Sequence, residues 1–244
     1  MSFYASITAG GRISGEFAQI AGTDVKALAR IGGRTMLDRA IDAARDGGAR
    51  GVAVIGGDEV RAGCEARVER VIPESPNGAE NLHAALFAWQ AERTLVLCSD
   101  LPFIAGAALR EFIERVPTEA LGMPITSAQS YASRFPNAVP HTTKIGSERI
   151  ANGSAFMFPA SSAETVDALA QRFFSARKSL LRMGLLIGPR LLLRFATSTL
   201  RISDLEAQAT MRLGFPVRAI RDCAPELCYD VDSLLEYSYA VAHT

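Results

Sequence analysis

The chain has 244 residues, of which 48% are apolar and 21% are charged. It carries 26 Lys and Arg residues against 26 Asp and Glu residues, so its formal net charge is zero. This composition is typical of a folded globular protein and excludes a disordered chain. Zero net charge argues against broad neutralisation of phosphates as the main activity, although it leaves room for a local basic patch, so we expect no nucleic-acid partner.

The cysteine and histidine residues are few and scattered. Only three His are present, and the four cysteines form no C-x-x-C pair: Cys64, Cys98, Cys223 and Cys228. This set has neither zinc-ligand spacing nor a disulfide framework. The N-terminus lacks a basic region followed by an apolar core, so we expect no signal peptide. The most apolar stretch, Leu180–Leu193, is interrupted by Arg182 and Arg190 and is too short to cross a bilayer. We therefore expect a cytoplasmic protein without an integral membrane segment.

The first half of the chain alternates short apolar runs with helical patterns. Thr35 has the features of a helix N-cap, and Asp46-Gly47-Gly48 those of a helix end. A second helix is predicted over Asn81–Gln90. Strands separated by single helices form right-handed βαβ units, so this half predicts a mainly parallel sheet. Its expected strands are Ser2–Thr8, Gly51–Ile55, Arg70–Pro73 and Thr94–Cys98.

The second half is less regular. Ser127–Pro140 is rich in polar residues and is predicted to be a long functional loop. Strands are expected at Ala120–Ile125, Ser154–Phe158 and Phe215–Ile220. Helices are expected at Ala163–Phe174, Leu180–Thr197, Ser203–Leu213 and Ser233–Ala242. No internal repeat or low-complexity linker divides the chain, so we predict one domain over residues 1–244. Its fold class is α/β, a three-layer α/β/α architecture with a mainly parallel mixed sheet, Rossmann-like in kind.

The first predicted strand runs into a glycine loop, Ala9-Gly10-Gly11-Arg12. Glycines let successive backbone N–H groups approach an anion, and an arginine adds charge-assisted hydrogen bonds. The loop is not a Walker A motif, because Glu16-Phe17 stand where Lys-Ser/Thr is required. It is not a Rossmann fingerprint either, since its glycines do not open directly into a helix. Taken alone, a simple tight turn remains the alternative interpretation.

Lys26 follows this loop in a chain whose basic residues are nearly all arginine. Of the 26 basic residues, 23 are Arg and three are Lys, namely Lys26, Lys144 and Lys178. A lysine that closes a glycine-rich loop can contact a phosphate as a point charge. The alternative is a solvated surface lysine.

Two acidic segments are candidates for a metal site. Asp100 follows a buried strand, and ligands of parallel sheets bind beyond the carboxyl ends of the strands. A carboxylate there can hold Mg²⁺, which prefers one or two carboxylates together with substrate phosphates. Asp230 and Asp232 precede the last predicted helix, and one of them could complete the site. The alternatives are a turn before Pro102 for Asp100 and a helix N-cap for the later pair.

In this order, the segments resemble the molybdenum-cofactor guanylyltransferase-like nucleotidyltransferases, which have the nucleotide-diphospho-sugar transferase (GT-A) fold. The resemblance covers nearly the whole chain, from the first strand to residue 233. It is carried by Ala9–Arg12, Lys26–Leu28, Ile31–Leu37, Ser99–Phe103 and Asp230–Ser233. Gly78–Leu82 and Asn152–Ala155 also resemble the base-side loop and the acceptor-side strand entry of that family.

The resemblance implies a Mg²⁺-dependent enzyme that transfers a nucleoside monophosphate from a nucleoside triphosphate to a phosphorylated small-molecule acceptor and releases pyrophosphate. Residues 1–125 would be the nucleotide-binding half and residues 126–244 the acceptor-side half. Ala9, Gly10, Gly11 and Arg12 would wrap the triphosphate, and Lys26 would neutralise its charge. Gly78 and Asn81 would lie near the base, and Asp100 and Asp232 would bind Mg²⁺. The catalytic residues would be Lys26, Arg12 and Asp100.

Two departures from the family pattern leave alternatives open. The segment between Arg12 and Lys26 is longer and more apolar than the family loop. This difference could alter how the loop binds a nucleotide. A Leu-rich helical insertion around residues 177–213 could form an acceptor lid, a homodimer contact or a lipid-facing patch. The competing functions are a GT-A-type glycosyltransferase with a nucleotide-sugar donor, and a non-catalytic nucleotide-binding protein with a degenerate site. Release of pyrophosphate would distinguish the first function from both.

Overall fold

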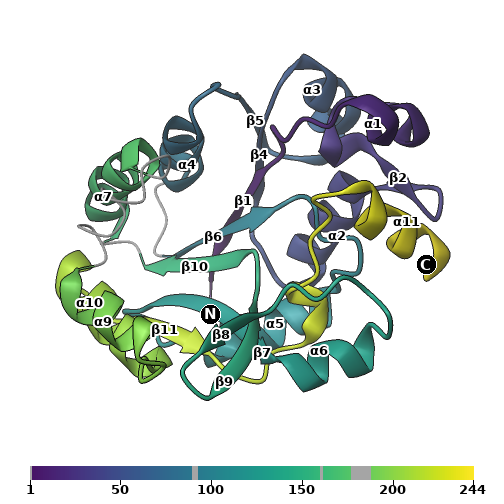
Figure 1. Ribbon diagram of the computed structural model, residues 1–244. Helices are drawn as coiled ribbons and strands as arrows, with labels where there is room; N and C mark the ends of the chain where they lie inside the picture. The colour runs from purple at the N-terminus through teal and green to yellow at the C-terminus, as the bar shows by residue number, and fades with distance from the viewer. Residues whose placement is uncertain (1, 90–92, 160–161, 177–187) are drawn as a thin grey trace.

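A mixed β-sheet forms the centre of the protein in the computed structural model, which describes residues 2–89, 93–159, 162–176 and 188–244 (Figure 1). Its described strands follow the order β5-β4-β1-β6-β10-β7-β9-β8, and β11 also pairs with β7. The strands are β1 Tyr4–Thr8, β4 Val52–Gly56, β5 Arg70–Pro73, β6 Arg93–Cys98, β7 Leu121–Ser127, β8 Thr143–Ile145, β9 Glu148–Asn152, β10 Ala155–Pro159 and β11 Val217–Ile220. A separate hairpin pairs β2, Arg30–Ile31, with β3, Arg34–Thr35.

Most of the sheet is parallel, as the sequence predicted. β1 lies between β4 and β6 and is parallel to both. β10 is antiparallel to β6 and to β7, and β11 is parallel to β7. The carboxyl ends of β1, β4, β5 and β6 therefore meet along one edge of the sheet, where ligands of such sheets bind.

Helices cover both faces of this sheet and complete three layers (Figure 1). They are α1 Gly15–Ala21, α2 Met36–Asp46, α3 Asp58–Cys64, α4 Gly78–Phe87, α5 Gly106–Arg115, α6 Ala128–Arg134, α7 Ala163–Ala176, α9 Pro189–Ala196, α10 Ile202–Leu213 and α11 Leu234–Ala242. No helix among the described residues is long and apolar enough to cross a membrane.

Alternation of side chains along the strands divides the core between the two faces. Ile7 and Leu97 face one side and pack with Leu37 and Ile41 of α2 and with Phe112 of α5. On the other side, a second cluster joins the sheet to α4, α7 and α10; it contains Ile55, Leu86, Val96, Phe158, Val166 and Leu213. The α/β, mainly parallel, three-layer prediction is confirmed.

Local sequence signals set several element boundaries. Thr35 caps α2 as predicted: its hydroxyl accepts the N–H of Asp38 at 3.0 Å, and the Asp38 carboxylate accepts the N–H of Thr35 at 3.3 Å. The predicted helix over Leu180–Thr197 is described only in part, as α9, because residues 180–187 lie outside the described residues. Helices α1, α3 and α5 and the β8–β9 hairpin were not predicted.

The prediction of a long loop at Ser127–Pro140 is wrong for the first half of that segment, which forms α6. Ser127 is the N-cap of this helix, and its hydroxyl accepts the N–H of Ser130 at 3.0 Å. Tyr131 and Phe135 are buried with Tyr229, so the helix has an apolar side with a partner in the core. The loop prediction depended on the serines of this segment, and one of them, Ser127, is the helix N-cap.

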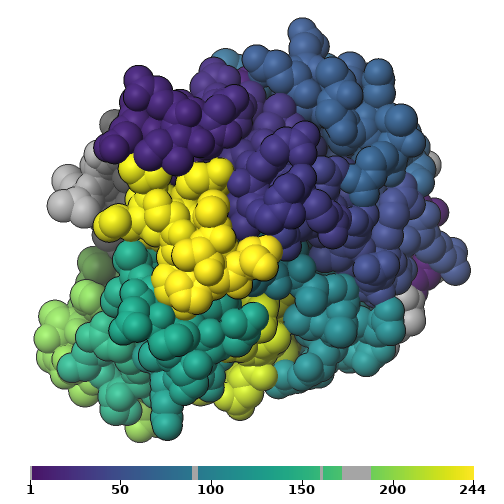
Figure 2. All heavy atoms as spheres, turned by 90° about the vertical axis from the view of Figure 1, so that its right-hand side faces the viewer, coloured from purple at the N-terminus to yellow at the C-terminus, as the bar shows by residue number. Residues whose placement is uncertain are grey.

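The long segment between Arg12 and Lys26 also contains a helix, α1. Its Phe17 ring is buried and lies 5.2 Å from the ring of Tyr237 on α11. The helix ends at Gly22, which has a left-handed conformation with φ of 69°. Figure 2 shows the C-terminal helix, in yellow, lying against this N-terminal segment, in purple. The apolar character of the segment is therefore explained by packing against the end of the chain.

Candidate functional site

Lys26 joins two acidic segments at the carboxyl edge of the sheet. Its Nζ donates to Asp100 Oδ2 at 2.6 Å and to Asp232 Oδ1 at 2.8 Å. The side chains of Lys26 and Asp100 are each 15% exposed, whereas that of Asp232 is 63% exposed. Burial alone would lower the pKa of Lys26, but the charges and hydrogen bonds of the two carboxylates outweigh burial and raise it. The lysine is therefore a firmly held cation and not the solvated surface residue of the alternative interpretation.

The glycine loop fixes the backbone at Lys26. The Lys26 N–H donates to Gly11 O at 2.9 Å, and the Ile13 N–H donates to Asp24 O at 2.9 Å. A Cβ at Gly11 would lie 3.1 Å from Lys26 Cε, so a larger residue there would press on the lysine side chain. The loop and Lys26 thus form one unit, with the lysine side chain passing directly over the second glycine.

Asp100 is placed by the end of β6 and by the segment before α11. The Ser99 N–H donates to Thr8 O at 3.2 Å, and the Val231 N–H donates to Asp100 O at 3.0 Å. Asp100 Oδ1 is buried and has no hydrogen-bond partner among the described residues. An orphaned carboxylate oxygen is costly in a protein interior, and a cation is one partner that would satisfy it.

Asp230 adds a third carboxylate to this acidic region. Burial raises its pKa first of all, and the negative charges of Asp100 and Asp232 raise it further, while His141 acts in the opposite direction. In the part of the chain that the structure describes, no three His, Cys, Asp or Glu side chains are grouped as a ready metal site. Two carboxylates beside the glycine loop nevertheless suit Mg²⁺, which takes its remaining ligands from water and substrate oxygens.

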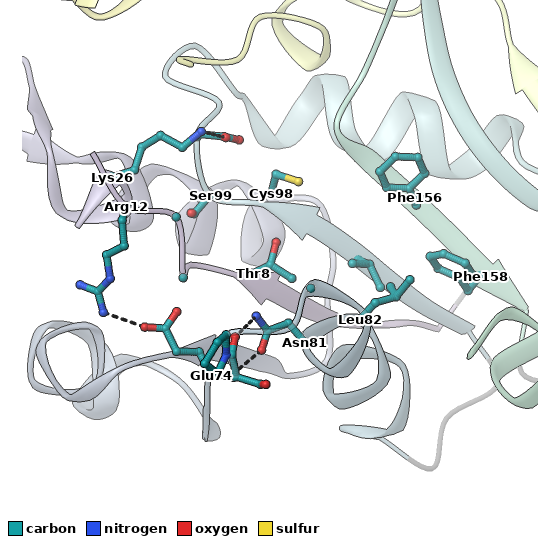
Figure 3. A pocket seen from close by; sticks show the side chains of 17 residues that line it. Thr8, Arg12, Lys26, Glu74, Asn81, Leu82, Cys98, Ser99, Phe156 and Phe158 are labelled. Carbon is teal, nitrogen blue, oxygen red and sulfur yellow. Dashed lines mark hydrogen bonds and ion pairs between the residues drawn. The ribbon is translucent and has the colours of Figure 1, made fainter. Parts of the chain in front are cut away.

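Arg12, the predicted phosphate-binding arginine, is paired with two acidic residues. It donates to Glu74 at 2.7 Å and to Glu59 at 3.1 Å, and its pKa is raised by the Glu59 hydrogen bond above all. Glu74 also lies directly over Gly10, because a Cβ at Gly10 would be 1.8 Å from Glu74 Oε2. The Glu74 carboxylate therefore lies against Gly10, where the sequence predicted a triphosphate. Figure 3 shows its contact with Arg12.

Gly78 and Asn81, at the start of α4, line the same pocket. Asn77 caps this helix by accepting the Ala79 N–H at 3.0 Å. The Asn81 amide accepts the Ser75 N–H at 2.7 Å and donates to Ser75 O at 2.8 Å. Both ends of that amide are therefore used to hold the loop that leads into α4, so Asn81 shapes this wall through the loop.

A cavity of about 980 Å³ joins these groups. Figure 3 shows Lys26 at one end of it and the rings of Phe156 and Phe158, on β10, at the other. The polar end includes the glycine loop and Asp100, and the apolar end adds Leu82 and Val96. The predicted residues Gly10, Gly11, Arg12, Lys26, Gly78, Asn81 and Asp100 all line this cavity. Ala9 is buried in the core beneath the loop, and Asp232 reaches the site through Lys26.

Sequence reasoning missed three residues that shape this region: Glu74, His141 and Glu236. Glu74 follows the predicted strand Arg70–Pro73, so its place after a parallel strand was a usable signal. Glu236 stands three residues after Ser233, which is capping-box spacing, but that spacing predicts only a helix start. Nothing in the neighbourhood of His141 in the sequence indicates its partner.

The fold and the site define an α/β protein with a pocket at the carboxyl edge of the parallel strands. Residues 5–183 match the MobA-like NTP transferase domain. The chain therefore belongs to the family of MobA-like NTP transferases. A comparison with curated proteins finds no match.

Solved structures with the same fold include several transferases. A hypothetical transferase from Thermus thermophilus is 27% identical, with a TM-score of 0.85 over 96% of this chain and 98% of that one. The 2-C-methyl-D-erythritol 4-phosphate cytidylyltransferase of Thermus thermophilus is 19% identical, with a TM-score of 0.58 over 100% and 98% of the two chains. A Mycobacterium tuberculosis protein solved with manganese is 19% identical, with a TM-score of 0.56 over the whole of both chains.

Proposed function

We propose that the protein transfers a nucleoside monophosphate from a nucleoside triphosphate to a phosphorylated small-molecule acceptor and releases pyrophosphate. The observation that carries the proposal is the contact of Lys26 with Asp100 and Asp232 beside the glycine loop. It places a cation and a cation-binding pair at one end of a cavity of about 980 Å³. Family membership supports the same reaction class, and structural neighbours whose names include cytidylyltransferases make CTP the first nucleotide to test.

In this proposal the chain contributes binding and electrostatic stabilisation instead of a covalent intermediate. Backbone N–H groups of the Ala9–Arg12 loop bind the triphosphate, and Lys26 neutralises the charge that develops on it. Gly78 and the loop held by Asn81 contact the base. The acceptor phosphate attacks the α-phosphorus in line, and pyrophosphate leaves toward the glycine loop.

Asp100 and Asp232 would hold a Mg²⁺ ion, a role supported by the buried, unpartnered Oδ1 of Asp100. When bound, this ion would neutralise phosphate charge as a Lewis acid. The Lys26 contacts with both carboxylates keep the acidic pair together through opposite charge, so the two aspartates do not repel one another out of reach.

A second candidate is a nucleotide-binding protein without transferase activity. It is favoured by one observation, the pairing of Arg12 with Glu59 and Glu74, which removes the loop arginine from direct contact with a phosphate. A GT-A glycosyltransferase is less well supported, because the glycine loop and Lys26 form a site suited to a triphosphate.

A pyrophosphate-release assay tests the proposal. Purified protein with Mg²⁺ is offered each of the four NTPs, starting with CTP, against phosphosugars, phospho-alcohols and molybdopterin. We expect acceptor-dependent release of pyrophosphate that is absent without Mg²⁺ and strongly reduced in Asp100→Asn. Nucleotide binding without any release in the whole panel would favour the non-catalytic candidate.

A further inference from the structure

The buried carboxylate of Glu236, on α11, fastens the segment that carries Asp232. Glu236 is 4% exposed. Its Oε2 accepts the N–H groups of Asp232 and Ser233, each at 2.6 Å. Its Oε1 lies 2.7 Å from Nε2 of His141, in the segment between α6 and β8. A carboxylate this deeply buried is stable only when its oxygens have such partners.

The same segment is also held by the residues that follow β6, among them Asp100. The Val231 N–H donates to Asp100 O at 3.0 Å, next to the bonds that Asp232 and Ser233 make with Glu236. Three consecutive N–H groups are thus directed to fixed acceptors. The exposed Asp232 carboxylate consequently projects from an anchored backbone toward Lys26.

Helix capping accounts for only part of these contacts. Ser233 and Glu236 form a capping box at the start of α11, and the bond from the Ser233 N–H belongs to that motif. The bond from the Asp232 N–H lies one residue outside the capping box. His141 comes from a different part of the chain and has no role in a capping box.

We propose that Glu236 and His141 form a positioning pair that holds Asp232 opposite Asp100 and thereby sets the affinity of the site for a divalent cation. The inference rests on the proposed function, which assigns the two aspartates to the cation. Asp100 keeps its place without the pair, because β6 and the Thr8 contact hold it. Without the pair, the backbone at Asp232 is no longer held. The distance between the carboxylates of Asp100 and Asp232 is then no longer fixed.

The test measures cation binding directly. The dissociation constant for Mn²⁺ is determined by electron paramagnetic resonance, with the unaltered full chain and a non-hydrolysable α,β-methylene nucleotide present. We expect Glu236→Ala, which removes the acceptor of both N–H groups, and His141→Ala each to raise that constant about 10-fold or more, as is typical when a partner behind a metal ligand is removed. His141→Gln, which puts an amide donor near Glu236 Oε1 in place of the imidazole, should recover most of the lost affinity.

Ser233→Ala is the matched control. It removes the other half of the capping box and leaves Glu236, His141 and Asp232 unchanged. We expect it to lower the melting temperature while the Mn²⁺ dissociation constant stays the same. If Glu236→Ala and His141→Ala lower the melting temperature but keep the original dissociation constant, the pair is merely structural and the proposal is wrong.

The outcomes separate this inference from the proposed function. Loss of Mn²⁺ affinity in the two variants, with no pyrophosphate released by the unaltered protein, supports the positioning pair and overturns the transferase reaction. Pyrophosphate release by the unaltered protein, with unchanged Mn²⁺ affinity in both variants, overturns only the positioning pair. If the unaltered protein with nucleotide binds no Mn²⁺, the positioning pair is also overturned.

Discussion

Lys26 Nζ and Asp100 Oδ2 lie 2.6 Å apart, although the residues are separated by 74 positions in the chain. Each side chain is 15% exposed, so water screens the pair only partly. The contact joins the glycine loop after β1 to the end of β6. It brings the two segments that the sequence marked for phosphate and for metal into one site.

Replacing Lys26 by Ala should reduce turnover about 10²- to 10³-fold, the usual loss when one group that stabilises transition-state charge is removed. The change also leaves Asp100 without its cationic partner, so we expect a lower melting temperature. Steady-state pyrophosphate release and thermal unfolding check both effects. Lys144→Ala is the control, because Lys144 is exposed on β8 and should be neutral in both assays. Near-normal turnover in Lys26→Ala would remove the lysine from the mechanism.

Asp100→Asn should cost a similar factor in turnover, about 10²- to 10³-fold. The amide keeps the shape of the side chain, so the fold should remain, but it lacks the charge that would bind a divalent ion. We therefore expect Mg²⁺ or Mn²⁺ to raise the melting temperature of the nucleotide-bound unaltered protein and to have little effect on this variant. An equal metal-induced shift in both would place the cation elsewhere.

Glu74→Gln should strengthen binding of a nucleoside triphosphate. The substitution removes a negative charge above Gly10 and frees Arg12, which together should lower the dissociation constant about 2- to 10-fold. Glu59→Gln is the matched control: Glu59 also pairs with Arg12, but its side chain is 59% exposed and lies outside the cavity lining, so its effect should be smaller. Calorimetric titration with nucleotide measures both. Weaker binding in Glu74→Gln would show that the carboxylate itself contacts the ligand.

Cys98 lines the cavity but should resist alkylation. Burial raises the pKa of its thiol to about 12, so at pH 8 the reactive thiolate is about one part in 10⁴. Burial also raises the pKa values of Cys64 and Cys223 to about 11 and that of Cys228 to about 12. Mass spectrometry after iodoacetamide treatment at pH 8 should find the native protein almost unmodified and the denatured protein modified at all four cysteines. Rapid labelling of native Cys98 would contradict this.

Asp230→Asn should stabilise the protein at neutral pH. The folded protein raises the pKa of this carboxyl, so the unfolded chain loses the proton first as the pH rises above about 3.8. The charged form therefore lowers the free energy of unfolding above that range, and the effect is absent where both states are protonated. Urea unfolding of both proteins at pH 3 and pH 7 should show a gain for Asp230→Asn only at pH 7. A gain of equal size at both pH values would assign the effect to packing.

Local patterns predicted much of the sheet and singled out several residues that the fold brings to one cavity. The apolar runs identified strands β1, β4 and β6, and Thr35 identified the start of α2. Lys26 was identified because lysine is rare in this chain, and Asp100 because it follows a predicted strand. Helix α6 was missed because a serine cap and polar side chains resemble a loop, while its burial depends on Tyr229, far away in the chain.

By itself, then, the sequence determined which segments become strands and helices and which residue types gather at strand ends, because those properties depend on neighbours a few positions away. Only the tertiary structure decided the pairings: Lys26 with Asp232, Arg12 with Glu74, and Glu236 with His141. Attraction between opposite charges depends on their distance in the folded protein and not on their separation in the sequence. Partners separated by 62 or 206 positions can be identified only after the sheet has brought them together.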